Sequence, residues 1–131
     1  MIAGKRYEAA SLLEIGRTCE KKGWDVVSGQ WIKYKLEDVG LRYCQPDVLI
    51  TLSPLEIILI EIKLKHTRRA FPQLTLYEEC LKGINPLFKV SKVIWCKYFD
   101  PVEGILPLKS ELEFNPNETV AVVWQGRKSG K

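Results

Sequence analysis

Hydrophobic residues near the start of the chain repeat with the period of an α-helix. Within residues 3–22, Leu12, Ile15 and Cys19 fall on one stripe, while most other positions are polar or small. Gly23 follows directly and is typical of a residue that ends a helix. We therefore predict an amphipathic helix over residues 3–22.

A looser alternation follows, and then two stretches dominated by aliphatic and β-branched residues. Residues 24–36 alternate around a central glycine, which indicates one or two strands meeting at a turn. The first aliphatic run, residues 47–52, is followed by the turn-forming residues Ser53 and Pro54 and by a second run at residues 56–65. This order predicts a β-hairpin.

The rest of the chain predicts one helix and two strands. Residues 71–82 have a helical pattern that ends at Gly83, residues 90–98 read as a buried strand, and residues 119–124 form a last short strand. Helix, strands, hairpin, helix, strand and strand together describe an α/β or α+β fold. We expect a central mixed β-sheet flanked by helices.

Length and composition favour one soluble domain. The 131 residues suffice for one core, so we expect a single domain over residues 1–126 followed by a basic tail over residues 127–131. With 46% hydrophobic and 27% charged residues and no long apolar run, the chain resembles neither a disordered nor a membrane-spanning protein. The first residues lack an apolar segment behind their basic residues, so we expect a cytoplasmic protein without a secretory signal.

Cysteines, tryptophans and net charge add weaker indications. The cysteines are Cys19, Cys44, Cys80 and Cys96. They form no Cys-x-x-Cys pair, which favours small core residues over a zinc or iron–sulfur site. The four tryptophans are expected in the core or on the sheet, although Trp31 with Tyr34, near lysines, is a candidate for stacking on bases. A net charge of +4 permits an anionic polymer as partner without requiring one.

Candidate chemistry lies on the strand predicted at residues 56–65. Side chains alternate between the two faces of a strand, so Glu61 and Lys63 share a face that is otherwise apolar. If residues 53–55 form a three-residue loop, Asp47 falls directly opposite Glu61, with Cβ atoms roughly 5 Å apart. Two carboxylates this close repel each other unless a divalent cation lies between them. We therefore predict a Mg²⁺ or Mn²⁺ site at Asp47 and Glu61, with Lys63 beside it to orient or deprotonate an attacking water.

Two short motifs in this hairpin, Pro46-Asp47 and Glu61-Ile62-Lys63, resemble the signature of the PD-(D/E)XK nuclease superfamily. That signature is an acid on one strand and an acid-x-lysine on the next. The resemblance implies a restriction-endonuclease-like fold and a metal-dependent DNA nuclease. It also implies that Asp47, Glu61 and the backbone carbonyl of Ile62 hold the metal, and that Lys63 is the catalytic lysine.

The following helix carries Gln73-Leu-Thr-Leu-Tyr77, which looks like the Gln-x-x-x-Tyr motif of the RecB-like branch of this superfamily. Residues one helical turn apart face the same way, so we assign Gln73 a catalytic role and Tyr77 a DNA-binding role at a metal-bound water or a phosphate. Members of the family also commonly place an acid on the first helix near the metal. We prefer Glu8 to Glu14 for this role, because Glu8 shares the apolar stripe of the helix.

Basic residues after the hairpin supply candidate phosphate contacts. Lys65, Arg68 and Arg69 crowd one short stretch, and such runs can neutralise phosphates, although a charge run is more often a solvated surface. The resemblance implies DNA as the partner. Many RecB-like enzymes act on DNA ends or single strands, which makes end or single-strand processing the implied activity.

Plainer explanations remain for each of these residues. Asp47 suits a turn cap, Glu61 and Lys63 suit a surface pair on an edge strand, and Tyr77 suits a half-buried core aromatic. Two other functions also stay open. One is a junction-resolving or restriction-type endonuclease that acts as a homodimer, and the other is a nuclease-like fold that only binds DNA or a protein.

Overall fold

The computed structural model describes residues 3–36, 40–65, 70–99, 108–109 and 118–126. The elements within them are α1 (Ala3–Lys22), β1 (Asp25–Ser28), β2 (Ile32–Leu36), β3 (Gly40–Cys44), β4 (Val48–Ser53), β5 (Glu56–Lys65), α2 (Ala70–Ile84), β6 (Lys89–Tyr98), β7 (Leu108–Lys109) and β8 (Thr119–Val123). Six of these strands form one sheet in the order β1-β4-β5-β6-β8-β7. Strands β2 and β3 form a separate two-stranded sheet.

Helix α1 has the extent and the end predicted for it. Its buried side chains are Tyr7, Ser11, Ile15 and Cys19, each four residues after the last. Gly23 adopts a positive φ of 71°, and its N–H donates to the carbonyl of Glu20. The N–H of Trp24 donates to the carbonyl of Cys19, which completes a Schellman-type end. Of the helices in the described residues, none is long and apolar enough to cross a membrane.

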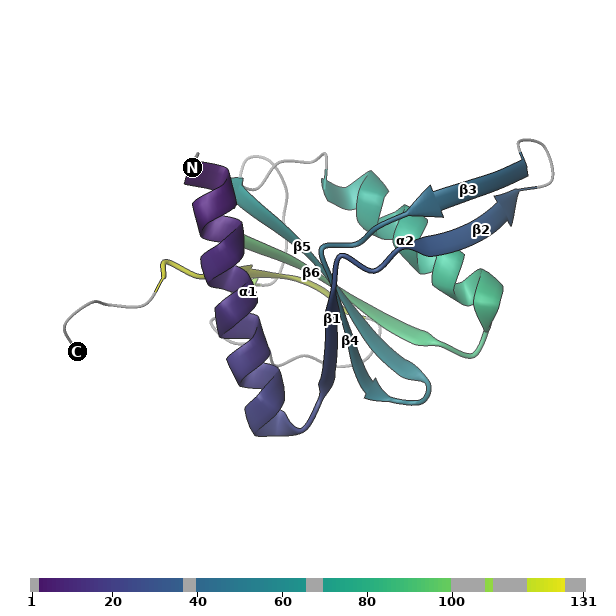
Figure 1. The fold of residues 1–131 in the computed structure, drawn as a ribbon, viewed down its shortest axis with the longest axis horizontal. Helices are drawn as coiled ribbons and strands as arrows, with labels where there is room; N and C mark the ends of the chain where they lie inside the picture. The colour runs from purple at the N-terminus through teal and green to yellow at the C-terminus, as the bar shows by residue number, and fades with distance from the viewer. Residues whose placement is uncertain (1–2, 37–39, 66–69, 100–107, 110–117, 127–131) are drawn as a thin grey trace.

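Strand β5 lies in the middle of the large sheet. It pairs with β4 in the antiparallel and with β6 in the parallel direction, and its residues 57–62 are all buried. Ile58 and Ile60 pack in a cluster with α1, whereas Ile57 and Leu59 pack in a cluster with α2. The two helices therefore cover opposite faces of the sheet (Figure 1). The predicted α/β class, with a mixed sheet flanked by helices, is confirmed.

The β4–β5 hairpin has the predicted register but a different turn. Ser53 pairs with Glu56, so the turn holds two residues where we predicted three. A register shift between Thr51 and Ser53 compensates for the shorter turn. Beyond this shift Val48 lies opposite Ile60, as the predicted register requires. The predicted turn was wrong, but the predicted register is confirmed from Thr51 to Val48, where the ladder ends one residue before Asp47.

Several other boundaries differ from the prediction. Strands β1 and β2 flank Gly29 as expected, but β1 pairs with β4 and β2 with β3, so they do not form a hairpin with each other. Helix α2 begins at Ala70 and continues through Gly83, ending just before Pro86, a residue that cannot continue a helix. Strands β3 and β7 were not predicted.

The cysteines and most tryptophans occupy the core. All four cysteines, each among the described residues, are buried and none forms a disulfide. Trp95 is buried, and Trp24 and Trp124 pack partly buried against the cluster beneath α1. Trp31 precedes β2 and lies outside the core, with 61% of its surface exposed. The expectation of a core or sheet position is therefore confirmed in the core for three tryptophans, while Trp31 is exposed beside the β2–β3 sheet.

Candidate active site

Glu61 is an acidic residue inside the central strand of the sheet. Only 3% of its surface is exposed, and it lies on the face of β5 that packs against α2. Its Oε2 atom is 3.4 Å from Nζ of Lys63, whose side chain is 34% exposed. Strand β5 lies between β4 and β6 and is not an edge strand, but its ladder with β4 ends at Ile60 and only β6 pairs with Glu61 and Lys63. A carboxylate in such a place is costly unless its charge is compensated.

Asp47 lies where β4 ends beside β5. Strand β4 begins at Val48, opposite Ile60, so in the described residues β5 continues past β4 without a ladder partner on that side. We call this place the β4 gap. The N–H of Ile62 points into the gap and donates to Oδ2 of Asp47 at 2.8 Å. The N–H and C=O of one strand residue face the same edge, so the carbonyl of Ile62 also faces the gap.

Electrostatics around the β4 gap are unfavourable for two ionised carboxylates. The pKa of Glu61 is raised from its ordinary value of 4.5 to about 7, first by burial and next by the negative charge of Asp47. Lys63 acts in the opposite direction and lowers this pKa, but it does not offset the other two effects. The protein therefore holds Glu61 close to the point where it gains or loses its proton near neutral pH.

The same atoms suit a hard divalent cation. Oε1 of Glu61 is buried and receives no hydrogen bond from the described residues while the carboxylate is ionised; a hydrogen bond with Asp47 is open to the protonated form only. A cation would satisfy this oxygen and relieve the repulsion from Asp47. Within the described part of the chain, no three His, Cys, Asp or Glu side chains gather into one metal-binding group. The protein donors would thus be two carboxylates and the Ile62 carbonyl, a small set that suits Mg²⁺ with several waters.

Of the two helix acids, Glu8 lies nearer to Asp47. Glu8 is exposed on α1, and with Asp47 it lines a shallow hollow of about 200 Å³. Glu8 does not join Asp47 and Glu61 in one group, because α1 covers the face of the sheet opposite Glu61. Glu14 instead lies 4.0 Å from Arg17 on the same helix. The structure thus brings Glu8 to the rim of the site and not to its centre.

Helix α2 brings Tyr77 to the two acids but leaves Gln73 in solvent. Tyr77 is 7% exposed, and its pKa is raised by burial and then by the charges of Glu61 and Asp47. Its phenol therefore stays protonated at neutral pH and can donate a hydrogen bond. Gln73, one turn earlier, is exposed. Gln73 and Tyr77 lie on the same side of α2, but Tyr77 is buried and Gln73 is exposed to solvent.

The candidate phosphate-binding residues are described only in part. Lys65 is exposed at the end of β5, two residues beyond Lys63. Arg68 and Arg69 lie outside the described residues, as does the basic tail at residues 127–131.

Two residues that the sequence did not single out hold Asp47 in position. Gly29 has a positive φ of 64°, and its N–H donates to the backbone carbonyl of Asp47 at 3.1 Å. The side-chain amide of Gln45 donates to the carbonyl of Gly29 at 2.7 Å. These bonds tie the end of β1 to the segment entering β4. The glycine in the turn was the only sequence signal for this contact.

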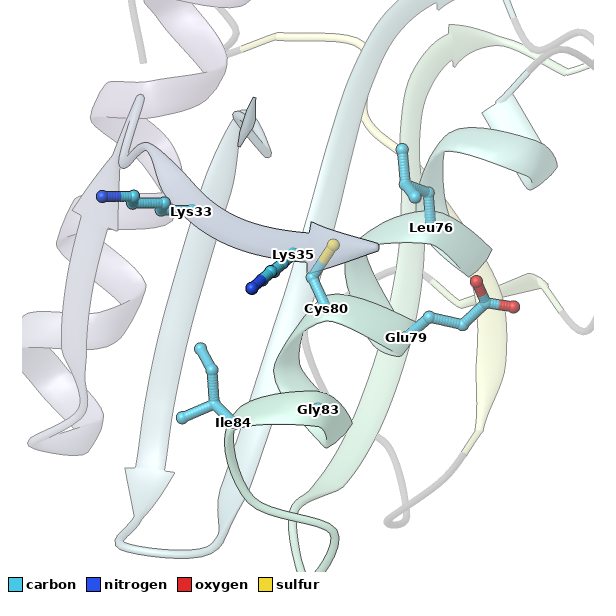
Figure 2. Close-up of a pocket in the computed structure, with 7 residues that line it drawn as sticks. All are labelled: Lys33, Lys35, Leu76, Glu79, Cys80, Gly83 and Ile84. Atoms are coloured by element: carbon cyan, nitrogen blue, oxygen red, sulfur yellow. The ribbon is translucent and has the colours of Figure 1, made fainter. Parts of the chain in front are cut away.

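A second hollow, of about 360 Å³, lies between β2 and α2. Its lining residues are Lys33, Lys35, Leu76, Glu79, Cys80, Gly83 and Ile84 (Figure 2). Nearby, the thiol of Cys44 donates to Sγ of Cys80 at 3.5 Å, a contact that packs the β2–β3 hairpin onto α2. The hollow includes neither Asp47 nor Glu61. Asp47 instead lines the shallower hollow beside α1, whose lining does not include Glu61.

Comparisons with known proteins found no relative of this chain. No protein-family description, no curated protein and no solved structure matches the chain.

Proposed function

We propose that the protein is a metal-dependent DNA nuclease whose active site is the β4 gap. The observation that carries the proposal is the buried Glu61 carboxylate, with one unsatisfied oxygen, beside Asp47 and Lys63. A purely structural ion pair would not need a second acid whose charge acts on the first, as that of Asp47 does on Glu61. The resemblance of these residues to the PD-(D/E)XK signature supports the same function.

Each residue has a role that follows from its position. Mg²⁺ or Mn²⁺ held by Asp47, Glu61 and the Ile62 carbonyl would supply a reactive water at neutral pH and neutralise phosphate charge. The ammonium group of Lys63, partly exposed beside Glu61, orients the attacking water or stabilises the negative charge that develops on the phosphate. Tyr77, protonated and close to both acids, offers a hydrogen bond toward the same centre.

The surroundings of the site support a polymeric substrate. Asp47 lines a hollow of about 200 Å³ beside α1, which is below the usual range for pockets that enclose small molecules and is not lined by Glu61 or Lys63. Lys65 continues the basic side of β5 beyond Lys63, where a phosphate backbone would pass. A restriction-endonuclease-like fold and a RecB-like preference for ends or single strands belong to this proposal. The position of Tyr77 and the helices on both faces of the sheet support them.

A cleavage assay tests the proposal. Labelled linear, circular, single-stranded and branched DNA are incubated with the protein in Mg²⁺, Mn²⁺ or EDTA, beside the variants Asp47→Asn, Glu61→Gln and Lys63→Met. We expect cutting only with a divalent cation and its loss in all three variants. Glu20→Gln and Lys89→Met remove similar charges from exposed positions and should cut like the wild type.

The outcomes separate the candidate functions. Metal-dependent cutting that survives in Glu61→Gln and Asp47→Asn would place the chemistry elsewhere. Salt-sensitive DNA binding without cutting under any condition would favour a nuclease-like binding module. Cutting by a persistent dimer, with paired incisions, would favour the junction-resolving or restriction-type enzyme.

A further inference from the structure

The β2–β3 hairpin has one buried face and one exposed face. Ile32 and Cys44, opposite each other in the register, are buried in the cluster beneath α2. Side chains alternate along a strand, so the neighbouring positions lie on the opposite face of the hairpin, although Lys33 and Lys35 also line the hollow beside α2 together with Glu79. We call this side the outer hairpin face. Its residues are Trp31, Lys33, Lys35, Leu41, Tyr43 and Gln45, all exposed.

Aromatic and cationic side chains interleave on the outer hairpin face. Trp31 and Tyr43 are 61% and 59% exposed, values far above those of the other described tryptophans. Lys33 lies directly opposite Tyr43 in the register, and Lys35 follows on the same face. Trp31 is a diagonal neighbour of Tyr43, within about 7–8 Å. None of the six residues on the face is acidic.

This composition matches the chemistry of a single nucleic-acid strand. Unpaired bases stack on exposed aromatic rings, and lysines beside the rings neutralise the phosphates. A second copy of the chain is a poorer fit, because a symmetric interface would set Lys33 and Lys35 against the same lysines of the partner. An apolar protein partner would leave the lysines desolvated and unpaired.

The outer hairpin face is also continuous with the candidate active site. Strand β3 ends at Cys44, and Gln45 and Pro46 lead directly to Asp47. Gln45, the last residue of the face, also borders the hollow that contains Asp47 and Glu8. In Figure 1 the hairpin extends outward from the sheet, and its base meets β4. A strand lying along the hairpin therefore leads toward the acids.

We propose that the outer hairpin face binds single-stranded DNA by stacking unpaired bases on Trp31 and Tyr43, with Lys33 and Lys35 contacting phosphates. The inference rests on the proposed function and specifies its substrate, a DNA with unpaired bases next to the scissile bond. Duplex DNA does not fit the face equally, because its bases are already stacked on one another.

Binding without catalysis tests the inference. The anisotropy of a short, fluorescently labelled oligodeoxythymidylate is measured with the full-length protein in EDTA, so that no cutting is required. We expect Trp31→Ala and Tyr43→Ala each to weaken binding between about 5- and 150-fold, the range for loss of one stacked base. Trp31→Phe should retain most of the affinity, and Lys33→Gln should lower the salt dependence of binding by about 0.7 in logarithmic slope. Leu13→Ala, at an equally exposed apolar position on α1, is the matched control.

Other outcomes would overturn the inference. These are wild-type protein that fails to bind the oligonucleotide, variants that bind like Leu13→Ala, or an equal loss of affinity for a blunt duplex. A dimer that Trp31→Ala converts to a monomer would identify the face as an interface between copies. The binding assay is independent of catalysis. The Trp31 and Tyr43 variants can lose DNA binding even if the protein never cuts DNA, and Glu61→Gln can lose cutting while DNA binding is unchanged.

Discussion

Removing the charge of Glu61 should stabilise the protein, and the gain should depend on pH. The folded state raises the pKa of this carboxyl from 4.5 to about 7, so it binds the proton more tightly than the unfolded chain does. Ionised Glu61 is therefore a penalty on folding that is absent below about pH 4.5, grows as the pH rises, and is complete above about pH 7. The difference between the pKa values of the unfolded and folded states corresponds to about 3 kcal/mol of unfolding free energy.

Glu61→Gln keeps the size of the side chain and removes its charge. In EDTA, we expect the variant to be about 3 kcal/mol more stable than the wild type at about pH 8 and nearly equal to it at about pH 4. Urea unfolding followed by tryptophan fluorescence measures the difference, and Glu20→Gln on α1 should stay within about 0.5 kcal/mol of the wild type at both pH values. A difference between Glu61→Gln and the wild type that does not change with pH would refute the reasoning.

Three further predictions follow from the same contacts. Mg²⁺ or Mn²⁺ should raise the thermal midpoint of the wild type, while Asp47→Asn and Glu61→Gln should show no rise in a calorimetric scan. Lys63→Met removes the group that lowers the pKa of Glu61, so its unfolding free energy should fall below that of the wild type at about pH 8 and match it at about pH 4, as seen in parallel urea titrations. Leu74→Ala should cost about 2–5 kcal/mol in urea unfolding, because Leu74 is 1% exposed between α2 and the sheet; Leu87→Ala, at 69% exposure, should change stability by less than about 0.5 kcal/mol.

Sequence patterns were most informative where the structure depends on residues that are close together in the chain. The buried stripe of α1 and the positive-φ Gly23 are local signals, and both appear in the structure as predicted. The strand alternation of β5 placed Glu61 and Lys63 on one face, and they form an ion pair there. The register of the hairpin was also predictable, because a slip of one residue would move every apolar side chain to the other face.

Pairing between distant segments was not predictable from local patterns. Strands β1 and β2 follow each other around Gly29, yet they belong to different sheets. Strand β1 pairs with β4, and strand β2 pairs with β3. The exposure of Trp31 depends on the same pairing, because the β2–β3 hairpin buries Ile32 and Cys44 against α2 and leaves Trp31 outside that cluster. The depth of Tyr77 likewise depends on how α2 packs on the sheet, which helical spacing does not specify.

The measurement that tests the central claim most directly is the single-turnover rate of DNA cleavage in Mg²⁺ by the wild type and by Glu61→Gln, both confirmed to be folded. The account predicts that the wild type cuts DNA and that EDTA stops the cutting. It also predicts that Glu61→Gln cuts at least about 100-fold more slowly, because losing a group that stabilises transition-state charge typically costs that much in rate. Equal rates for the two proteins, or cutting that persists in EDTA, would contradict a metal-dependent nuclease site at Asp47 and Glu61.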